Sequence, residues 1–347
     1  MNFLSDNTSG TNQEILDYLN TINHSYSNAY GEDQTTAKAN KLLSDFFEKE
    51  VQVYFVSSGT IANSLALAHQ IDGYGTIITH PEEHIANDEC GAPSFFANGA
   101  QIKTASEDLS KLTPDVILKM INRSTPHGIH NSIPQALCIS QTTAFGTVYK
   151  PYELKAIGDI CSKNSLAFHV DGARFSNALV SNINSPAELT WKQGVTSLAL
   201  GGTKNGLIMG EAIVFFDKKL SDTFVRVHKR SGQLVSKMRF FSGQWIPYLQ
   251  LEIWKKNATA ANSMGKKLGQ ILAKSKHISV LTSTETNIII CKIPKLLSTF
   301  LTDNGVQFYP WKSSEQEAAR FVTSFTTTNS DIENLNDLLS RFESYDP

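Results

Sequence analysis

Charge, cysteine and long hydrophobic runs are all scarce in this sequence, and each shortage excludes a class of protein. Charged residues make up 18% of the 347 positions, below the usual share of about 25%, which indicates a large core or a surface covered by other subunits. The four cysteines are scattered without a Cys-x-x-Cys pair, so we expect reduced thiols and no disulfide framework. No run approaches the roughly 18 apolar residues of a membrane span, and no signal-peptide pattern opens the chain. We therefore expect a cytoplasmic globular protein.

The charge balance also limits the partners. Lys and Arg together number 31 and Asp and Glu number 33, for a net charge of −2. A nucleic-acid partner or a polybasic contact with a membrane is therefore not expected. The hydrophobic share of 41% excludes disorder, and the length predicts about two domains.

Short apolar runs alternate with helical patterns up to about residue 240. Strands are expected at 51–56, 75–79, 136–140, 165–170, 195–200 and 211–216, with helices at 60–70 and 151–163 among them. Apolar strands separated by helices are typical of a mostly parallel sheet that is covered on both faces. The fold class is therefore α/β, and residues 1–245 are expected to form an N-terminal segment and a large domain.

After residue 245 the pattern changes to that of a smaller α+β domain, expected over 246–347. A long helix is expected at 247–273, then strands at 278–281, 286–293, 305–308 and 320–324, with helices at 294–303 and from residue 331. No Gly/Ser-rich linker separates the two parts, so we expect them to pack tightly together.

Two segments carry the most informative chemistry. Asp171 follows the expected strand 165–170, and Lys204 follows the strand 195–200 in a glycine-rich turn. The carboxyl ends of strands are where α/β folds bind ligands. A lysine amine can form a Schiff base with a cofactor aldehyde, and an acidic side chain can hold the proton on a pyridine nitrogen. Each residue alone is more typical of a cap or a surface, but the pair predicts a pyridoxal 5'-phosphate site.

The turn Ser57-Ser58-Gly59-Thr60 joins an expected strand to an expected helix. Backbone N–H groups at such a turn can bind a phosphate. The turn lacks the Gly-Lys of a P-loop and the spaced glycines of a dinucleotide site. Such a turn is as often only a helix cap, but together with Asp171 and Lys204 it supplies a third anchor for the cofactor.

These residues belong to a longer series of motifs that runs along nearly the whole chain. The series is Ser5-Asp6-Asn7, Tyr30-Gly31-Glu32-Asp33, Ser58-Gly59-Thr60-Ile61-Ala62-Asn63, His84-Ile85-Ala86-Asn87-Asp88-Glu89-Cys90-Gly91, Asp171-Gly172-Ala173-Arg174, Gly201-Gly202-Thr203-Lys204-Asn205-Gly206, Met238-Arg239-Phe240 and Arg320-Phe321-Val322. With these motifs the sequence resembles the low-specificity L-threonine aldolases, which belong with the β-eliminating lyases among the pyridoxal-phosphate enzymes of the aspartate-aminotransferase fold type (fold type I).

The resemblance implies a role for each motif. Lys204 would form the Schiff base (aldimine) with the cofactor, Asp171 would pair with the pyridine nitrogen, and His84 would stack on the ring. The phosphate would be held by Ser58, Gly59 and Thr60, with Arg239 or Lys229 from a neighbouring subunit. The substrate would be bound by Ser5, Tyr30, Arg174 and Arg320, and Arg174 would also border the cofactor. Guanidinium groups suit the substrate carboxylate because they bind carboxylates in a planar bidentate manner.

The sequence departs from the family pattern at one position. Many members of the family carry a second histidine in a Thr-His-Asn segment, where this chain reads Ser140-Gln-Thr-Thr143. His127 and His130 lie upstream, and we expect His130 to be the substitute that takes the proton of the substrate hydroxyl.

The resemblance implies retro-aldol cleavage of L-threonine or L-allo-threonine to glycine and an aldehyde, a step of threonine catabolism. It also implies a homotetramer with each site at a dimer interface. One alternative is another pyridoxal-phosphate enzyme of fold type I, a β-eliminating lyase or an aminotransferase. A remote alternative is a zinc hydrolase, because His80-Pro-Glu-Glu83-His84 fits the pattern HxxEH. Pro81 makes the required helix start awkwardly, and we expect no metal.

Overall fold

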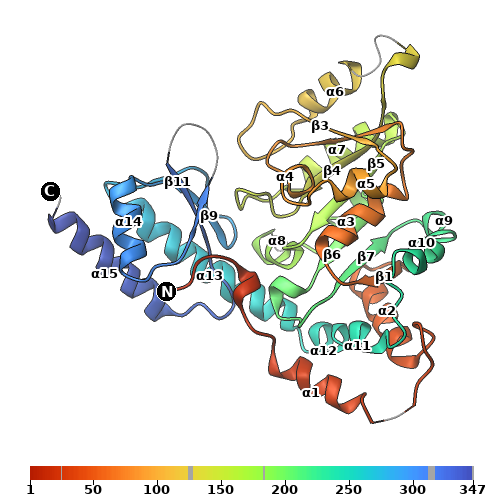
Figure 1. Cartoon of the computed structure of the whole chain (residues 1–347), viewed down its shortest axis with the longest axis horizontal. Helices are drawn as coiled ribbons and strands as arrows, with labels where there is room; N and C mark the ends of the chain where they lie inside the picture. The colour runs from red at the N-terminus through yellow and green to blue at the C-terminus, as the bar shows by residue number, and fades with distance from the viewer. Residues whose placement is uncertain (25, 124–127, 183, 312–316, 346–347) are drawn as a thin grey trace.

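The computed structural model describes residues 1–347 except 25, 124–127, 183, 312–316 and 346–347. The chain forms one seven-stranded sheet and one four-stranded sheet. Figure 1 shows the larger sheet and its helices on one side and the smaller sheet with the C-terminal helices on the other.

The larger sheet is almost entirely parallel, as the sequence predicts. Its strands are β1 (Gln52–Val56), β2 (Gly75–Thr79), β3 (Gln101–Thr104), β4 (Ile133–Ser140), β5 (Ala167–Gly172), β6 (Ser197–Gly201) and β7 (Glu211–Phe215). They are ordered β1-β7-β6-β5-β4-β2-β3, and β7 alone among these strands runs antiparallel to its neighbours. The predicted α/β class is confirmed, although β3 was not foreseen.

Helices cover both faces of the larger sheet because its strands are apolar on both sides. One face carries α3 (Gly59–Ala68) and α5 (Ala92–Phe96), and the other carries α2 (Gln34–Phe46), α6 (Pro114–Arg123), α7 (Pro151–Lys163) and α8 (Phe175–Asn182). Within β6, Leu198 and Leu200 join the core that contains Leu154 of α7, whereas Ala199 between them joins the core that contains Leu65 of α3. This alternation follows from the two-residue period of a strand.

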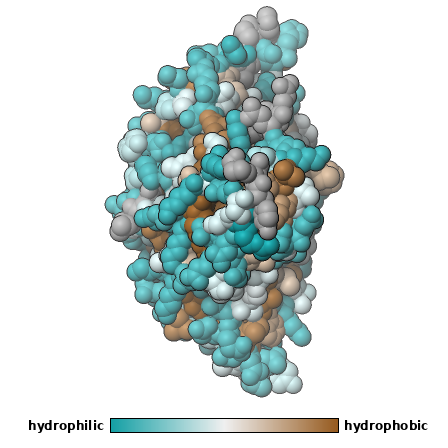
Figure 2. Space-filling view, turned by 90° about the vertical axis from the view of Figure 1, so that its left-hand side faces the viewer, coloured by the Kyte–Doolittle hydropathy of each residue, from teal (hydrophilic) through white to brown (hydrophobic). Residues whose placement is uncertain are grey.

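The smaller sheet is antiparallel. Its strands are β8 (Ser279–Val280), β9 (Ile288–Lys292), β10 (Tyr309–Trp311) and β11 (Ala318–Val322), in the order β10-β11-β9-β8. It packs against α13 (Ile253–Lys274), α14 (Lys295–Asp303) and α15 (Asn329–Tyr345), around a core that includes Leu268, Ile289, Phe321 and Leu335. Figure 2 shows the side of the molecule that carries these helices, and it is mostly hydrophilic with small separate hydrophobic areas.

Two predictions in this second part differ from the structure. The helix expected at 247–273 is divided into α12 (Trp245–Gln250) and α13, because Glu252 has a left-handed backbone with φ 53°. The strand expected at 305–308 is wrong; the strand β10 begins at Tyr309, while Gln307 forms an isolated bridge with Asn2. The division at residues 245 and 246 stays a prediction, because α13 contributes Ile253 to the larger core and Leu268 to the smaller one.

The remaining helical segments are short. They are α1 (Gln13–Thr21), α4 (His84–Asn87), α9 (Lys218–Ser221), α10 (Phe224–Arg230), α11 (Arg239–Ser242) and the 3₁₀ turns η1 (Asp6–Thr8), η2 (Gly128–His130), η3 (Trp191–Gln193) and η4 (Thr203–Asn205). Within the described part of the chain, no helix combines the length and the apolar character that crossing a bilayer requires.

Candidate active site

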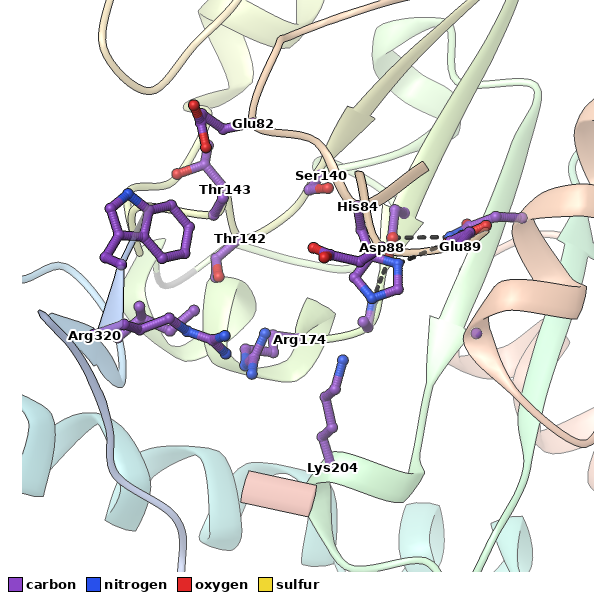
Figure 3. Close-up of a pocket in the computed structure, with 17 residues that line it drawn as sticks. Glu82, His84, Asp88, Glu89, Ser140, Thr142, Thr143, Arg174, Lys204 and Arg320 are labelled. Carbon is purple, nitrogen blue, oxygen red and sulfur yellow. Dashed lines mark hydrogen bonds and ion pairs between the residues drawn. The ribbon is translucent and has the colours of Figure 1, made fainter. Parts of the chain in front are cut away.

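A pocket lies at the carboxyl ends of the parallel strands, and Ile288, Trp311 and Arg320 of the smaller sheet contribute to its lining. This is the edge at which open α/β sheets bind ligands. The predicted site residues that line it are Gly59, His84, Asp171, Arg174, Lys204 and Arg320. Figure 3 shows Lys204 pointing toward His84, with Arg174 and Arg320 beside it.

Lys204 is held in the tight turn η4 after β6. Gly201 lies so close to the backbone of Ala173 that a Cβ there would stand 2.4 Å from the Ala173 oxygen. The Gly202 N–H donates to the Glu211 carboxylate at 3.0 Å, which fixes the turn from the other side. Burial, followed by the charge of Arg174, lowers the pKa of Lys204. A lowered pKa makes the amine more readily available as a nucleophile toward an aldehyde.

Asp171 is the penultimate residue of β5 and is 6% exposed. Its carboxylate accepts hydrogen bonds from the Ala173 N–H at 2.9 Å and from Asn63 Nδ2 at 2.8 Å. Burial alone would raise the pKa of Asp171, but the charges of His84 and Lys204, together with these two hydrogen bonds, hold it below its ordinary value. Asp171 is therefore an ionised carboxylate that faces the pocket.

Asn63 of α3 joins the acidic groups of the site. Its Nδ2 donates to Asp171 and also to Glu89 Oε1 at 2.9 Å, and its Oδ1 lies 3.0 Å from His169 Nε2. Because an amide oxygen only accepts, the bonding pattern assigns the proton of His169 to Nε2. The other nitrogen, Nδ1, then accepts from Ser197 Oγ at 2.8 Å. Burial lowers the pKa of His169 to about 4, so this histidine is neutral.

His84 begins α4, and its ring borders the pocket with 43% of the side chain exposed. Its Nδ1 lies 2.8 Å from Oε1 of the fully buried Glu89 (Figure 3). The hydrogen bond to Glu89 raises the pKa of His84. Glu89 therefore fixes the orientation of the imidazole and leaves Nε2 as the nitrogen that can exchange a proton with a ligand.

Arg174, in the turn between β5 and α8, and Arg320, on the smaller sheet, reach the same part of the pocket (Figure 3). Arg320 stands on β11, and burial, followed by the charge of Arg174, lowers its pKa to about 10. Two neighbouring guanidinium groups in a partly dry site favour an anionic ligand with planar oxygens, such as a carboxylate. Ser5 lines an adjoining pocket that shares Arg174, Lys204 and Arg320 with this one.

Several predicted site residues do not line the pocket. Ser58 Oγ accepts from the Ile61 N–H at 3.4 Å, as the N-cap of α3. Arg239 lines a separate surface cavity with Asn23 and Tyr26, and Tyr30 lies outside the pocket with the Lys229 amine 4.2 Å from its ring centre. Thr60 follows Gly59 at the start of α3 and does not line the pocket.

The prediction that His130 takes the hydroxyl proton needs correction. His130 ends η2 and precedes β4, whereas the pocket lies beyond Ser140, at the other end of that strand. The eight residues of β4 separate the two places by more than 20 Å at about 3.3 Å per residue. His130 therefore does not reach the pocket of its own chain, and His127 lies outside the described residues.

The zinc-hydrolase alternative is also wrong on geometry. His80 Nε2 lies 3.1 Å from the Asp108 carbonyl oxygen and its Nδ1 accepts from the Glu82 N–H, so both ring nitrogens are occupied. Glu83 points to Ser140, which donates to it through both its N–H and its hydroxyl. Ligand atoms of His84, Glu89 and Asp171 do lie within 4.8 Å of one another. Their hydrogen bonds to each other and to Asn63 account for that proximity without an ion.

Other pocket residues were not singled out from the sequence. They are Asn63, Glu82, Asp88, Glu89, Ser140, Thr142, Thr143, Ala144, Ala173, Ile288 and Trp311. Asn63 and Glu89 lie inside motifs that the sequence shows, and membership of those motifs was the available signal. Trp311 and Ile288 come from the smaller sheet, and no local pattern relates them to the larger one.

Comparison with known proteins gives a consistent result. Residues 2–294 match the sequence profile of the family described as beta-eliminating lyase. The chain is 39% identical to the low specificity L-threonine aldolase of a Pseudomonas species, over 96% of this chain and 95% of that protein. It is also 39% identical to the low specificity L-threonine aldolase of Pseudomonas aeruginosa, over 97% and 95% of the two chains. The solved structure of a threonine aldolase from Leishmania major matches with a TM-score of 0.91 and 25% identity, over 98% of this chain and 99% of that one.

Proposed function

The chain belongs to the beta-eliminating lyase family, and we propose that it is a threonine aldolase that cleaves L-threonine and L-allo-threonine to glycine and an aldehyde. The observation that carries this proposal is the meeting of an amine, an ionised carboxylate and two guanidinium groups in one pocket. Relatives that are 39% identical over nearly the full length and bear the name low specificity L-threonine aldolase support it.

We propose pyridoxal 5'-phosphate as the cofactor, because the donor set fits its three functional groups. Lys204 would bind its aldehyde carbon, and Asp171 would hold a proton at its pyridine nitrogen. The N–H groups at the start of α3, next to Gly59, would bind its phosphate. When bound, the cofactor supplies an electron sink for the bond that breaks at the substrate Cα.

The protein's own groups would then orient the substrate and move its protons. Arg174 and Arg320 would bind the carboxylate and thereby set the direction of the Cα–Cβ bond. His84 provides the one imidazole among the described residues that line the pocket. With Nδ1 on Glu89, its Nε2 would take the proton of the β-hydroxyl as that bond breaks.

We propose further that the site is completed by a second copy of the chain, in a homotetramer built of dimers. Arg239 or Lys229 would reach the phosphate of the partner subunit's site, and Tyr30 would bind the substrate. In support, Arg239 does not line the pocket of its own chain and instead borders a separate surface cavity. The protein would act in the cytoplasm, where free thiols persist; its four cysteines are free and three of them are buried.

Product analysis tests the reaction. Incubation of the purified holoenzyme with L-threonine should release glycine and acetaldehyde in equal amounts. Release of 2-oxobutanoate and ammonia would favour an eliminating lyase, and amino-group transfer to a 2-oxo acid would favour an aminotransferase. Lys204→Ala should lose the visible absorbance of the bound cofactor and the turnover, whereas Lys276→Ala, at an exposed lysine far from the pocket, should keep both.

A further inference from the structure

The first twelve residues run between the two sheets and are fixed at both ends. At one end the Phe3 N–H donates to Gln307 at 2.8 Å, and Phe3 itself is fully buried in the smaller core. At the other end, Thr11 Oγ1 donates at 2.6 Å to the oxygen of Gly206, which closes the Lys204 turn. The segment thus links the smaller sheet to the turn that carries the lysine.

Asp6 lies between these two anchors and is 2% exposed. Its Oδ2 and Oδ1 accept from Arg174 Nε and Nη2, each at 2.8 Å. Asn287, next to β9 of the smaller sheet, donates to Asp6 Oδ2 at 2.9 Å and to the Thr323 oxygen at 2.7 Å. One edge of the Arg174 guanidinium is therefore occupied by Asp6. The other edge, with the two N–H groups of Nη1 and the second N–H of Nη2, is left for a ligand.

The ion pair with Asp6 fixes the orientation of the Arg174 guanidinium as well as balancing its charge. A bidentate carboxylate fixes both the position and the plane of a guanidinium group. Arg174 stands between Arg320 and Lys204 in the pocket (Figure 3), so a rotation of its plane would change the direction in which a bound carboxylate lies. Removal of the Asp6 charge would at the same time make the surroundings of Arg174 and Arg320 more positive, which attracts an anionic substrate.

We propose that Asp6 is a positioning residue, which holds Arg174 so that its free edge directs the substrate carboxylate and aligns the bond that breaks. The inference rests on the proposed function. Loss of the correct orientation of Arg174 should lower kcat, because a misdirected substrate reacts slowly. The stronger attraction for an anion should keep KM low, because the substrate still binds to the freed arginine. A comparison of kcat with KM therefore separates the two effects.

The test uses the holoenzyme with Asp6→Asn, Asp6→Glu and the control Asp17→Asn, at an exposed aspartate of α1. Asp6→Asn should lower kcat for L-threonine cleavage by tenfold or more, since misplacement by about 1 Å can cost 100-fold. KM, and the dissociation constant of glycine from calorimetry, should rise less than about threefold. Asp6→Glu keeps the charge but lengthens the side chain by one methylene, and it should also lower kcat. Asp17→Asn should match the wild type.

Three results would overturn the inference. The first is an unchanged kcat in Asp6→Asn with intact thermal unfolding. The second is a raised KM with unchanged kcat, which would make Asp6 a determinant of binding alone. The third is a wild-type kcat in Asp6→Glu, which would assign the effect to charge and not to position. If the wild type itself releases no glycine and aldehyde, the proposed function fails instead, so the two failures are distinguishable.

Discussion

The replacement Asn63→Ala should destabilise the protein more than any exposed substitution, because Asn63 joins three buried polar groups. The side chain is 1% exposed, and its hydrogen bonds reach Asp171, Glu89 and His169 at 2.8 to 3.0 Å. Each buried partner left unpaired costs about 1 to 3 kcal/mol. Losses within one network do not add fully, so we expect the free energy of unfolding to fall by about 4 kcal/mol.

Equilibrium unfolding in urea, followed by tryptophan fluorescence, measures this change. The matched control is Ser64→Ala, one residue further along α3. Ser64 is fully buried, and its hydroxyl has no hydrogen-bond partner among the residues that the structure describes, so its removal should leave the stability unchanged. A difference of less than about 1 kcal/mol between the two variants would refute the view that the Asn63 network supports the site.

Three further predictions concern other parts of the molecule. Burial raises the pKa of Glu83 to about 7. The folded state therefore keeps a proton that the unfolded state releases near pH 4.5, and the free energy of unfolding falls as the pH rises from about 4.5 to 7. Glu83→Gln removes this loss, and its unfolding free energy relative to the wild type should increase between about pH 5 and pH 7.5; a constant difference would contradict the assignment. Gly146→Ala should destabilise the folded state by about 1 to 3 kcal/mol, because φ is +76° and a Cβ would stand 2.5 Å from a backbone oxygen of the smaller sheet. In the control Gly10→Ala the added Cβ meets no atom within 4 Å. That control should be neutral in thermal unfolding. Arg320→Gln should raise KM for L-threonine by about 10- to 100-fold through the loss of a charged hydrogen bond, and an equal KM in Arg320→Gln and the exposed control Arg341→Gln would exclude Arg320 from binding.

The residues that could be predicted from the sequence are those whose signal is local. Asp171 lies near the end of the apolar strand β5, Lys204 follows β6, and Gly59 begins the helix that follows β1. The mostly parallel order of strands places all three at one edge of the sheet. The chemistry of each residue, together with that placement, was enough to predict the pocket.

The partners of these residues could not be predicted, because their contacts join distant parts of the chain. Asn63 contacts Asp171 across 108 positions, and Asp6 contacts Arg174 across 168. His130 shows the opposite error. It is close in sequence to the missing family histidine, but the whole of β4 lies between it and the pocket. Closeness along the chain says little about position when a strand crosses the sheet in between.

Reductive trapping shows directly whether Lys204 holds the cofactor in this pocket. Purified protein loaded with pyridoxal 5'-phosphate is reduced with borohydride, digested, and its peptides are analysed by mass spectrometry. We expect one reduced cofactor per chain, attached to the peptide that contains Lys204. Attachment to another lysine, or no attachment at saturating cofactor, would contradict it.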